Sequence, residues 1–418
     1  MKAFSRTEPV SSGEIYLDNP ATTPCDPRVV EKMLPYFTQS FGNPHSRNHA
    51  LGWAAEDAVT QARWQIAAAL GCDEREVVFT SGASEANILV LRGVMMRSQK
   101  AHGSCAPHLI TTQTEHKSIL TCCHQLEREG VQVTYLPVDS EGRIRLRDLE
   151  ESLRPTTDLV SVAAVNNETG VIQPLQEIGA FCKEHNLLFH TDATQALGKI
   201  PLALEAWNVA FASFSAHKIY GPKGVGVLYI RSQLPVRLYP IFAGGGQQRG
   251  LRGGTLPVPL CVGFGEACHI LTNAEEHSAE VKRITELSRK LYEGLVSNIP
   301  LARLNGSLEH KVPHILNVLF PYVEGESLAM SLPHICVSTG SACSSEKLEP
   351  SHVLKAMGVD EVAAQSSIRF GLGRFTTPEE IDTVVQATIT AVQRLRELSP
   401  LWDMYQSGVD FSTIQWSE

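Results

Sequence analysis

The sequence has no long apolar run and no excess of positive charge. No segment approaches the roughly 18 consecutive apolar residues of a membrane-spanning helix, and residues 1–15 contain no apolar stretch of the kind that directs secretion. The 36 lysines and arginines are outnumbered by 45 aspartates and glutamates, which gives a formal net charge of −9. We therefore expect no nucleic-acid partner and no membrane partner, and we expect the chain to act on small molecules and other proteins.

The ten cysteines lack the spacing of a metal or redox motif. No two of them form a C-x-x-C pair, which disfavours zinc ribbons and thioredoxin-like sites, and no resident metal is predicted. Because no export signal is evident, we expect most thiols to be reduced core residues of a cytoplasmic protein. Lys2, Arg6 and several serines also fit the alternative of a mitochondrial or mitochondrion-derived organelle matrix, although Glu8 counts against a presequence.

Short apolar runs alternate with stretches of helical spacing, such as residues 54–70 and 175–185. The runs are "EVVFTS", "HLITTQ", "VQVTYLPV", "LVSVAAV", "LLFHTDA", "VAFASFS" and "GVGVLYI". This alternation predicts an α/β fold in which helices wrap a mainly parallel sheet, and ligands of such folds bind at the carboxyl ends of the strands.

The pattern changes near Asn273. A charged helical stretch follows, then the strand-like runs "HILNVLF" and "SIRFGLG" and a last helix near residues 378–397. We predict a large domain at residues 28–275 and a smaller α+β domain formed by residues 1–27 and 276–418.

The segment "SAHKIYGPKG" places Lys218 between two apolar runs, where a cation is costly unless it is paired or used chemically. Asp192 follows the preceding strand-like run, so adjacent strands would bring it close to Lys218. A desolvated lysine is a nucleophile toward an aldehyde, and an aspartate can hold a pyridinium nitrogen. An alternative for Asp192 is an ordinary cap of a helix that begins near Ala193.

A third feature is "FTSGASEAN", a glycine turn that leads into a helix. Free N–H groups at a helix start, with nearby hydroxyls, can bind a phosphate, although Ser81 or Ser84 could equally be an ordinary N-cap. A lysine, an aspartate and a phosphate seat together indicate pyridoxal 5'-phosphate (PLP) as the cofactor.

The order and spacing of twelve segments, from Tyr16 to the C-terminus, resemble the housekeeping, IscS-type cysteine desulfurases of the class-V aminotransferase family. The segments are "YLDNPATTP", "FGNPHSRNH", "FTSGASEAN", "TEHKSIL", "VNNETGVIQP", "HTDATQALGK", "SFSAHKIYGPKG", "GLRGGTLPV", "VEGESL", "STGSACSS", "LEPSHVL" and "SSIRFGLGRFT". The resemblance implies the PLP-dependent transferase fold of type I.

The resemblance also implies a role for each matched residue. Lys218 would hold PLP covalently, Asp192 would keep its pyridine nitrogen protonated, and Gln195 would bind its phenolic oxygen. His116 would stack on the ring and help to move protons. At the phosphate, the resemblance implies Ala83, Ser84, Ser215 and His217. It also implies a homodimer, in which Thr255 of the neighbouring subunit contacts the same phosphate. At the substrate carboxylate, it implies Asn167 and Arg369. Simpler alternatives are a helix cap for His116, a loop end for Thr255 and a surface ion pair for Arg369.

Cys343 would distinguish the chain from a transaminase. The resemblance implies that its thiolate takes sulfur from L-cysteine as a persulfide and leaves L-alanine. The sulfur would pass to an IscU-type iron–sulfur scaffold, with contact between Cys343 and the cluster during transfer, and to carriers for tRNA thiolation. The glycine and serine content around Cys343 is typical of a loop, and the alternative for this residue is a buried thiol.

The chain departs from the family pattern at Ser84, Ala216, residues 86–88 and residues 346–347. Two other classes remain open from the residues: a related PLP enzyme, such as a selenocysteine lyase or an aminotransferase, and a scaffold without turnover. The aromatic segment 398–418 is expected either to pack on its own domain or to bind the iron–sulfur scaffold.

Overall fold

The computed structural model describes residues 13–103, 105–232, 234, 237–339 and 350–408. Its largest element is a seven-stranded sheet with the strand order β2-β8-β7-β6-β5-β3-β4. Every strand except β8 runs in the same direction, because β8 pairs antiparallel with both β2 and β7. The predicted α/β fold with a mainly parallel sheet is confirmed.

The strands coincide with the apolar runs of the sequence. They are β2 (Val77–Thr80), β3 (His108–Thr112), β4 (Gln132–Leu136), β5 (Thr157–Ser161), β6 (Leu188–Asp192), β7 (Phe211–Ser215) and β8 (Gly226–Ile230). Alternate residues of β7 join different hydrophobic clusters: Ala212 and Phe214 face one, and Phe211 faces the other. The sheet is therefore buried on both faces, as parallel sheets are.

Helices cover both faces of this sheet. One cluster packs against α1 (Pro27–Met33), α3 (Ala50–Leu70), α7 (Leu175–Glu184) and α8 (Val258–Leu271), and the other against α4 (Ala83–His102) and α5 (Lys117–Arg128). The shorter helices of this part are α2 (Pro35–Thr38), η1 (Glu74–Glu76), α6 (Leu146–Glu151), η2 (Ala216–Lys218) and η3 (Gln247–Gly250).

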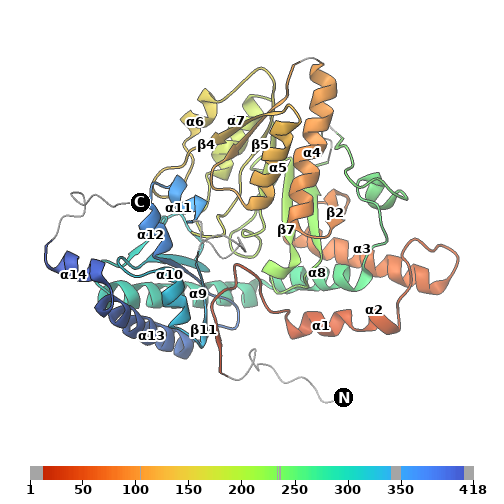
Figure 1. The fold of residues 1–418 in the computed structure, drawn as a ribbon. Helices are drawn as coiled ribbons and strands as arrows, with labels where there is room; N and C mark the ends of the chain where they lie inside the picture. Colours follow the sequence, from red (N-terminus) through yellow and green to blue (C-terminus); the bar gives the residue numbers. More distant parts are fainter. Residues whose placement is uncertain (1–12, 104, 233, 235–236, 340–349, 409–418) are drawn as a thin grey trace.

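A second core lies around the C-terminal part, at the lower left of Figure 1. A four-stranded sheet has the order β12-β13-β10-β9, with β9 (Arg303–Leu304), β10 (Ile315–Leu319), β12 (Ser338–Thr339) and β13 (Ser367–Gly371). The long helices α9 (Ala274–Asn298) and α13 (Pro378–Glu397) pack together over it. The shorter elements here are α10 (Gly325–Met330), α11 (His352–Ala356), α12 (Glu361–Gln365) and α14 (Pro400–Gln406).

The N-terminal segment joins this second part. Strand β1 (Ile15–Tyr16) pairs in parallel with β11 (Ile335–Cys336), and Asp18 bridges to Gly371. The expected boundary between residues 275 and 276 falls in the first turn of α9, and the proposed domain limits stay a prediction. No helix in the described ranges is long and apolar enough to cross a membrane.

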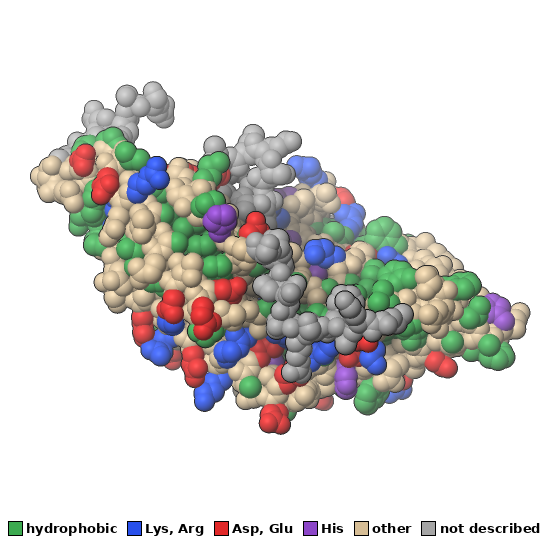
Figure 2. Space-filling view, turned by 90° about the horizontal axis from the view of Figure 1, so that it is seen from below, with side chains coloured by type: hydrophobic (Ala, Val, Ile, Leu, Met, Phe, Trp, Pro, Cys, Tyr) green, Lys and Arg blue, Asp and Glu red, His purple; other side chains and the backbone are tan. Residues whose placement is uncertain are grey.

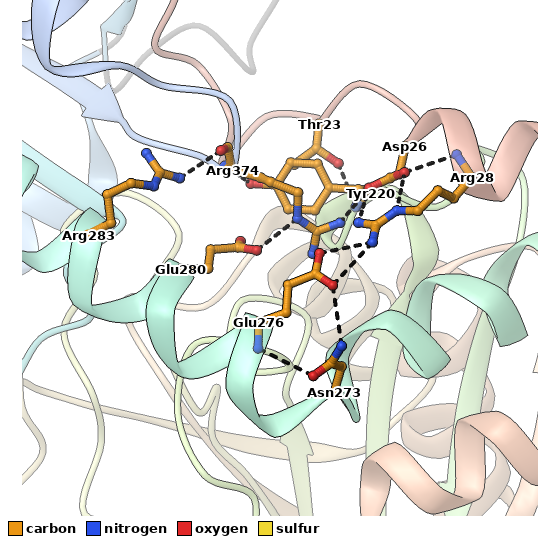
Figure 3. Close-up of polar contacts among 9 residues, drawn as sticks. All are labelled: Thr23, Asp26, Arg28, Tyr220, Asn273, Glu276, Glu280, Arg283 and Arg374. Atoms are coloured by element: carbon orange, nitrogen blue, oxygen red, sulfur yellow. Dashed lines mark hydrogen bonds and ion pairs between the residues drawn. The ribbon is translucent and has the colours of Figure 1, made fainter. Parts of the chain in front are cut away.

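A buried arginine connects the two parts of the chain. Arg374 contacts the Asp26 and Glu280 carboxylates at 2.8 Å each, and its guanidinium lies 4.2 Å from the centre of the Tyr220 ring. Figure 3 shows these side chains together, with Arg28 and Glu276 extending the network. Burial raises the pKa of Asp26, but hydrogen bonds from Arg28 and Arg374 outweigh burial and hold it below its usual value.

This network predicts a large stability change for Arg374→Met. The substitution removes this partner from the buried Asp26 carboxylate and from the Glu280 carboxylate, which is 11% exposed, so the free energy of unfolding falls by about 3–5 kcal/mol in urea titrations. The matched control is Arg289→Met, which removes an exposed pair with Glu293 and should change little. Equal losses in the two variants would contradict the assignment of Arg374 as the connection.

Candidate active site

Two of the predicted residues lie at the carboxyl ends of adjacent strands. Asp192 ends β6, and Lys218 lies in the short helix η2 that follows β7. The two strands pair in parallel, with Asp192 opposite Ser213. The expectation that consecutive strands bring Asp192 and Lys218 to one edge of the sheet therefore agrees with the register.

The amine of Lys218 is held by backbone carbonyl groups. Its Nζ donates to the oxygens of Pro20 and Ala21, both at 2.6 Å, and the side chain is half-buried. These carbonyls are neutral acceptors, so they solvate the amine without the charge of a carboxylate.

The segment 18–23 contacts most of the predicted site. Gln195 Nε2 donates to the Pro20 oxygen at 2.9 Å, and Thr22 Oγ1 lies 3.1 Å from Nδ1 of His217. Asp18 pairs with Arg369 at 2.7 Å. Sequence reasoning used this segment only as part of the motif "YLDNPATTP" and assigned it no role. Residues 18–23 have only short side chains and one proline, Pro20, and this was the available signal for backbone contacts.

Asp192 is 8% exposed and accepts two hydrogen bonds. Its Oδ1 accepts from the Thr194 N–H at 3.0 Å, and its Oδ2 accepts from Nδ2 of Asn87 at 2.8 Å. The alternative of a helix cap is only partly confirmed: the cap-like bond to Thr194 forms, but residues 194–199 form turns and no helix. Asn87 is fully buried on α4. The sequence indicates only that residues 86–88 depart from the family pattern, and it predicts no role for Asn87.

A hydrogen-bonded chain joins Asp192 to His116. Asn87 Nδ2 also lies 3.0 Å from Ser118 Oγ, which lies 2.8 Å from Nδ1 of His116. Nδ1 accepts from the Ser118 backbone N–H at 3.1 Å, so His116 caps α5, and the simpler reading of this residue is confirmed. Because Nδ1 is an acceptor here, the neutral ring carries its proton on Nε2.

The electrostatics of His116 favour its neutral form. The ring is solvent-accessible on one side, but desolvation by the surrounding protein atoms is the main cause that lowers its pKa; the negative charge of Asp192 raises the pKa, and the positive charge of Lys218 lowers it. The charges of both residues thus act on the His116 ring.

The start of α4 fits a phosphate seat. The helix begins at Ala83 after Gly82, and no side chain caps its first turn, so the N-cap alternative for Ser81 and Ser84 is not what forms. A Cβ on Gly82 would lie 3.8 Å from Ser215 Oγ, which places a hydroxyl beside the helix start. Both Ala83 and Ser84 lie at this end, where the helix dipole favours an anion.

Arg369 lies in β13 and is 4% exposed, so the alternative of a surface ion pair is wrong about its position. One terminal nitrogen pairs with Asp18, and the other donates to the backbone oxygen of Asn167 at 3.0 Å. Within the described residues its Nε has no hydrogen-bond partner. A guanidinium with an unused donor suits a substrate carboxylate.

Two predicted residues are not placed at the site. Thr255 is exposed on the loop before α8, and none of the described contacts joins it to Lys218 or Asp192. Cys343 lies outside the described residues.

The grouping fits PLP on its own chemistry. It combines an amine for covalent attachment, a buried carboxylate for a pyridinium, an uncapped helix start for a phosphate, and an arginine with a spare donor. No group of metal-binding side chains occurs within the ranges that the structure describes.

Comparison with known proteins assigns the chain to a family. The family model of class-V aminotransferases matches residues 15–384. The chain therefore belongs to the class-V aminotransferase family, and the predicted type I fold and PLP dependence are confirmed.

Within this family, the chain is similar to proteins named as cysteine desulfurases or NifS-like proteins. A mitochondrial cysteine desulfurase of Arthroderma benhamiae is 53% identical over 407 residues, which is 97% of this chain and 79% of that protein. A solved NifS-like protein has a TM-score of 0.83 and 39% identity, covering 91% of this chain and 99% of its own. The structure of SspA in complex with cysteine has a TM-score of 0.76 and 36% identity, covering 87% of this chain and 100% of its own. The expected similarity to cysteine desulfurases is confirmed.

The charges around His116 predict its titration. Because desolvation by neighbouring protein atoms lowers the pKa of His116, we expect its ring to titrate below the ordinary value of 6.5 in histidine NMR spectra. In Asp192→Asn the midpoint should fall further, because the charge that raises the pKa is removed. A midpoint above 6.5, or one that does not move in Asp192→Asn, would contradict this account.

Proposed function

We propose that the chain is a PLP-dependent cysteine desulfurase that converts L-cysteine to L-alanine and retains the sulfur as a persulfide on Cys343. The observation that carries this proposal is the placement of Lys218 and Asp192 at the ends of adjacent strands, in a chain about half identical to cysteine desulfurases. The solved relative with bound cysteine supports the same substrate.

The cofactor would withdraw electrons from the substrate, and the residues around it would move protons and hold the cofactor ring. When bound, PLP supplies an electron sink for the bond that breaks at the substrate Cα. Lys218 carries the cofactor and moves the Cα proton, while Asp192 keeps the ring nitrogen protonated. Asn87 and the Thr194 N–H hold the Asp192 carboxylate in place for that role. Neutral His116 covers the ring and exchanges protons through Nε2.

The remaining residues orient the cofactor and the substrate. In the proposal the first turn of α4, with Ala83 and Ser84, and the side chains of Ser215 and His217 bind the phosphate, and Gln195 binds the phenolic oxygen. Arg369 and Asn167 bind the substrate carboxylate. The Asp18 pair and the Asn167 carbonyl hold the Arg369 guanidinium so that Nε remains available.

Sulfur transfer belongs to Cys343 in this proposal. The electron pair of its thiolate forms a bond to the substrate sulfur, and the carbon–sulfur pair returns to carbon, which is protonated and leaves as alanine. Only the thiolate is competent for this attack. A selenocysteine lyase or an aminotransferase would share Lys218 and Asp192 without requiring a persulfide on this cysteine.

The assay that tests this function uses cysteine alone, without a keto acid. We expect the wild type to form alanine and a protein persulfide, and borohydride reduction to fix the pyridoxyl group on Lys218. Cys343→Ser should bind PLP but form no protein persulfide, because its hydroxyl cannot accept the sulfur. Lys218→Ala should do neither, with an unchanged fold by circular dichroism.

Three outcomes would reject parts of the assignment. A pyridoxyl adduct on another lysine would reject Lys218, and a persulfide on Cys336 with undiminished alanine release would reject Cys343. A colourless wild type that forms no alanine would favour a scaffold without turnover.

A homodimer is supported by apolar surface on α2, α3 and the loop between them. Phe37, Phe41 and Trp64 are 56%, 64% and 56% exposed, and hydrophobic side chains gather on that side of the molecule, at the right of Figure 2. Patches of this kind are typical of protein interfaces. The proposal also requires a second copy, because Thr255 is away from the site of its own chain and would serve its neighbour's phosphate seat.

The proposed sulfur acceptors are an IscU-type iron–sulfur scaffold and carriers for tRNA thiolation.

The location of the protein in the cell is a proposal as well. The fungal relative is named mitochondrial, which supports the organelle matrix over the cytoplasmic expectation.

The C-terminal segment divides into two parts. Trp402 stacks on Tyr405 with ring centres 5.4 Å apart, Tyr405 packs on Tyr322 at 5.0 Å, and Arg396 lies 4.3 Å from the Trp402 ring. Helix α14 therefore packs on its own domain, as one expectation had it. Phe411 and Trp416 lie outside the described residues, and we propose that they dock the scaffold.

Deletion of residues 408–418 tests this docking. We expect PLP content, thermal stability and alanine formation to stay nearly unchanged, because α14 keeps its contacts, while scaffold binding and cluster assembly fall sharply. The matched control, Trp402→Ala, should lower the unfolding temperature, because it removes packing on Tyr405 and Arg396. A truncated enzyme that binds and supplies the scaffold normally would reject the docking role.

A further inference from the structure

Gln195 lies between two groups of opposite hydrogen-bonding character. Its Oε1 accepts from Nζ of Lys199, and its Nε2 donates to the backbone oxygen of Pro20 at 2.9 Å. An ammonium group only donates and a backbone carbonyl only accepts. A flipped amide would place its NH₂ against the ammonium and its oxygen against the carbonyl, so the two neighbours together permit one orientation while Lys199 is protonated.

The same carbonyl connects this amide to the reactive lysine. The Pro20 oxygen accepts from Nζ of Lys218 at 2.6 Å as well as from Gln195 Nε2. The NH₂ end of Gln195 therefore lies beside the Lys218 amine, and its oxygen points away toward Lys199. An amide nitrogen has two N–H groups, so one remains for a ligand attached at Lys218.

Lys199 occupies an unfavourable place for a cation. It lines one small cavity with Lys218, Glu280 and His314. Desolvation, and then the charges of Lys218 and Arg369, lower the pKa of Lys199 to about 7. Within the described residues its ammonium forms no salt bridge, and the hydrogen-bond partner that it has is Gln195.

A turn in the local backbone places the Lys199 side chain next to Gln195. Lys199 follows Gly198, which has a positive φ of 72°, and its N–H donates to the Ala196 oxygen at 2.9 Å. This tight turn brings the side chain back over Gln195, four residues earlier. Gly198 is the residue type that adopts such a φ without strain.

We infer that Lys199 is a positioning residue, which holds the Gln195 carbonyl so that the Gln195 N–H faces the phenolic oxygen of the cofactor. The inference rests on the proposed function, since it requires PLP on Lys218. A donor at this oxygen stabilises its anionic form and so favours loss of the proton from the bound cofactor. A carbonyl oxygen in the same place would repel the anion.

The test follows the visible absorption of the purified holoenzyme as a function of pH. Lys199→Met removes the donor and keeps a side chain of similar length. We expect the apparent pKa of the bound cofactor to rise by about one unit, a tenfold change in proton affinity, because Gln195 is released to rotate. Lys199→Arg retains a donor and should restore most of the wild-type value.

Loss of the Lys199 charge could raise the same pKa directly, and a double-mutant cycle separates the two causes. If Lys199 acts through Gln195, Lys199→Met adds little in a Gln195→Leu background. Additive shifts, or no shift in Lys199→Met alone, would overturn the inference. Thermal unfolding of each variant shows whether the fold is retained.

PLP binding and the position of the borohydride-fixed group distinguish failure of the proposed function from failure of the Lys199 inference. A wild type that binds no PLP, or that carries the borohydride-fixed group on another lysine, rejects the cofactor site and this inference with it. A normal adduct on Lys218 with additive shifts rejects only the role of Lys199.

Discussion

The solvation of one amine, that of Lys218, organises the site. A lysine at the end of a buried strand requires hydrogen-bond acceptors, and a carboxylate partner would stabilise the charged form that cannot act as a nucleophile. Two of the acceptors are the carbonyl groups of Pro20 and Ala21. These oxygens carry no formal charge and hold the amine in place.

The need for those carbonyls fixes the path of the segment 18–23. Its side chains reach both parts of the chain, since Asp18 pairs with Arg369 of the smaller sheet and Thr22 contacts His217 beside the larger one. Farther along, Asp26 binds Arg374. One segment, which turns at residues 19–21, thereby contacts both Arg369 and Lys218.

A second organising element is the chain of hydrogen bonds from Asp192 through Asn87 and Ser118 to His116. It keeps the aspartate accepting and the histidine neutral, and it combines residues from β6, α4 and the start of α5. Such buried networks are worth most when every member is satisfied. Here Oδ1 of Asn87 has no partner within the described residues, which leaves one acceptor at the centre of the site.

The parallel sheet and the positions of Asp192 and Lys218 could be predicted from the sequence, because local apolar runs encode strands and strand ends hold ligands. The sulfur chemistry of Cys343 is implied by the resemblance of its motif and stays a prediction, because the residue lies outside the described ranges. The partners of the site residues could be found only in the folded chain, such as the Pro20 carbonyl for both Lys218 and Gln195. Contacts between residues nearly 200 positions apart, and those made by backbone carbonyls, leave no periodic signal in a single sequence, because any residue type supplies the same carbonyl.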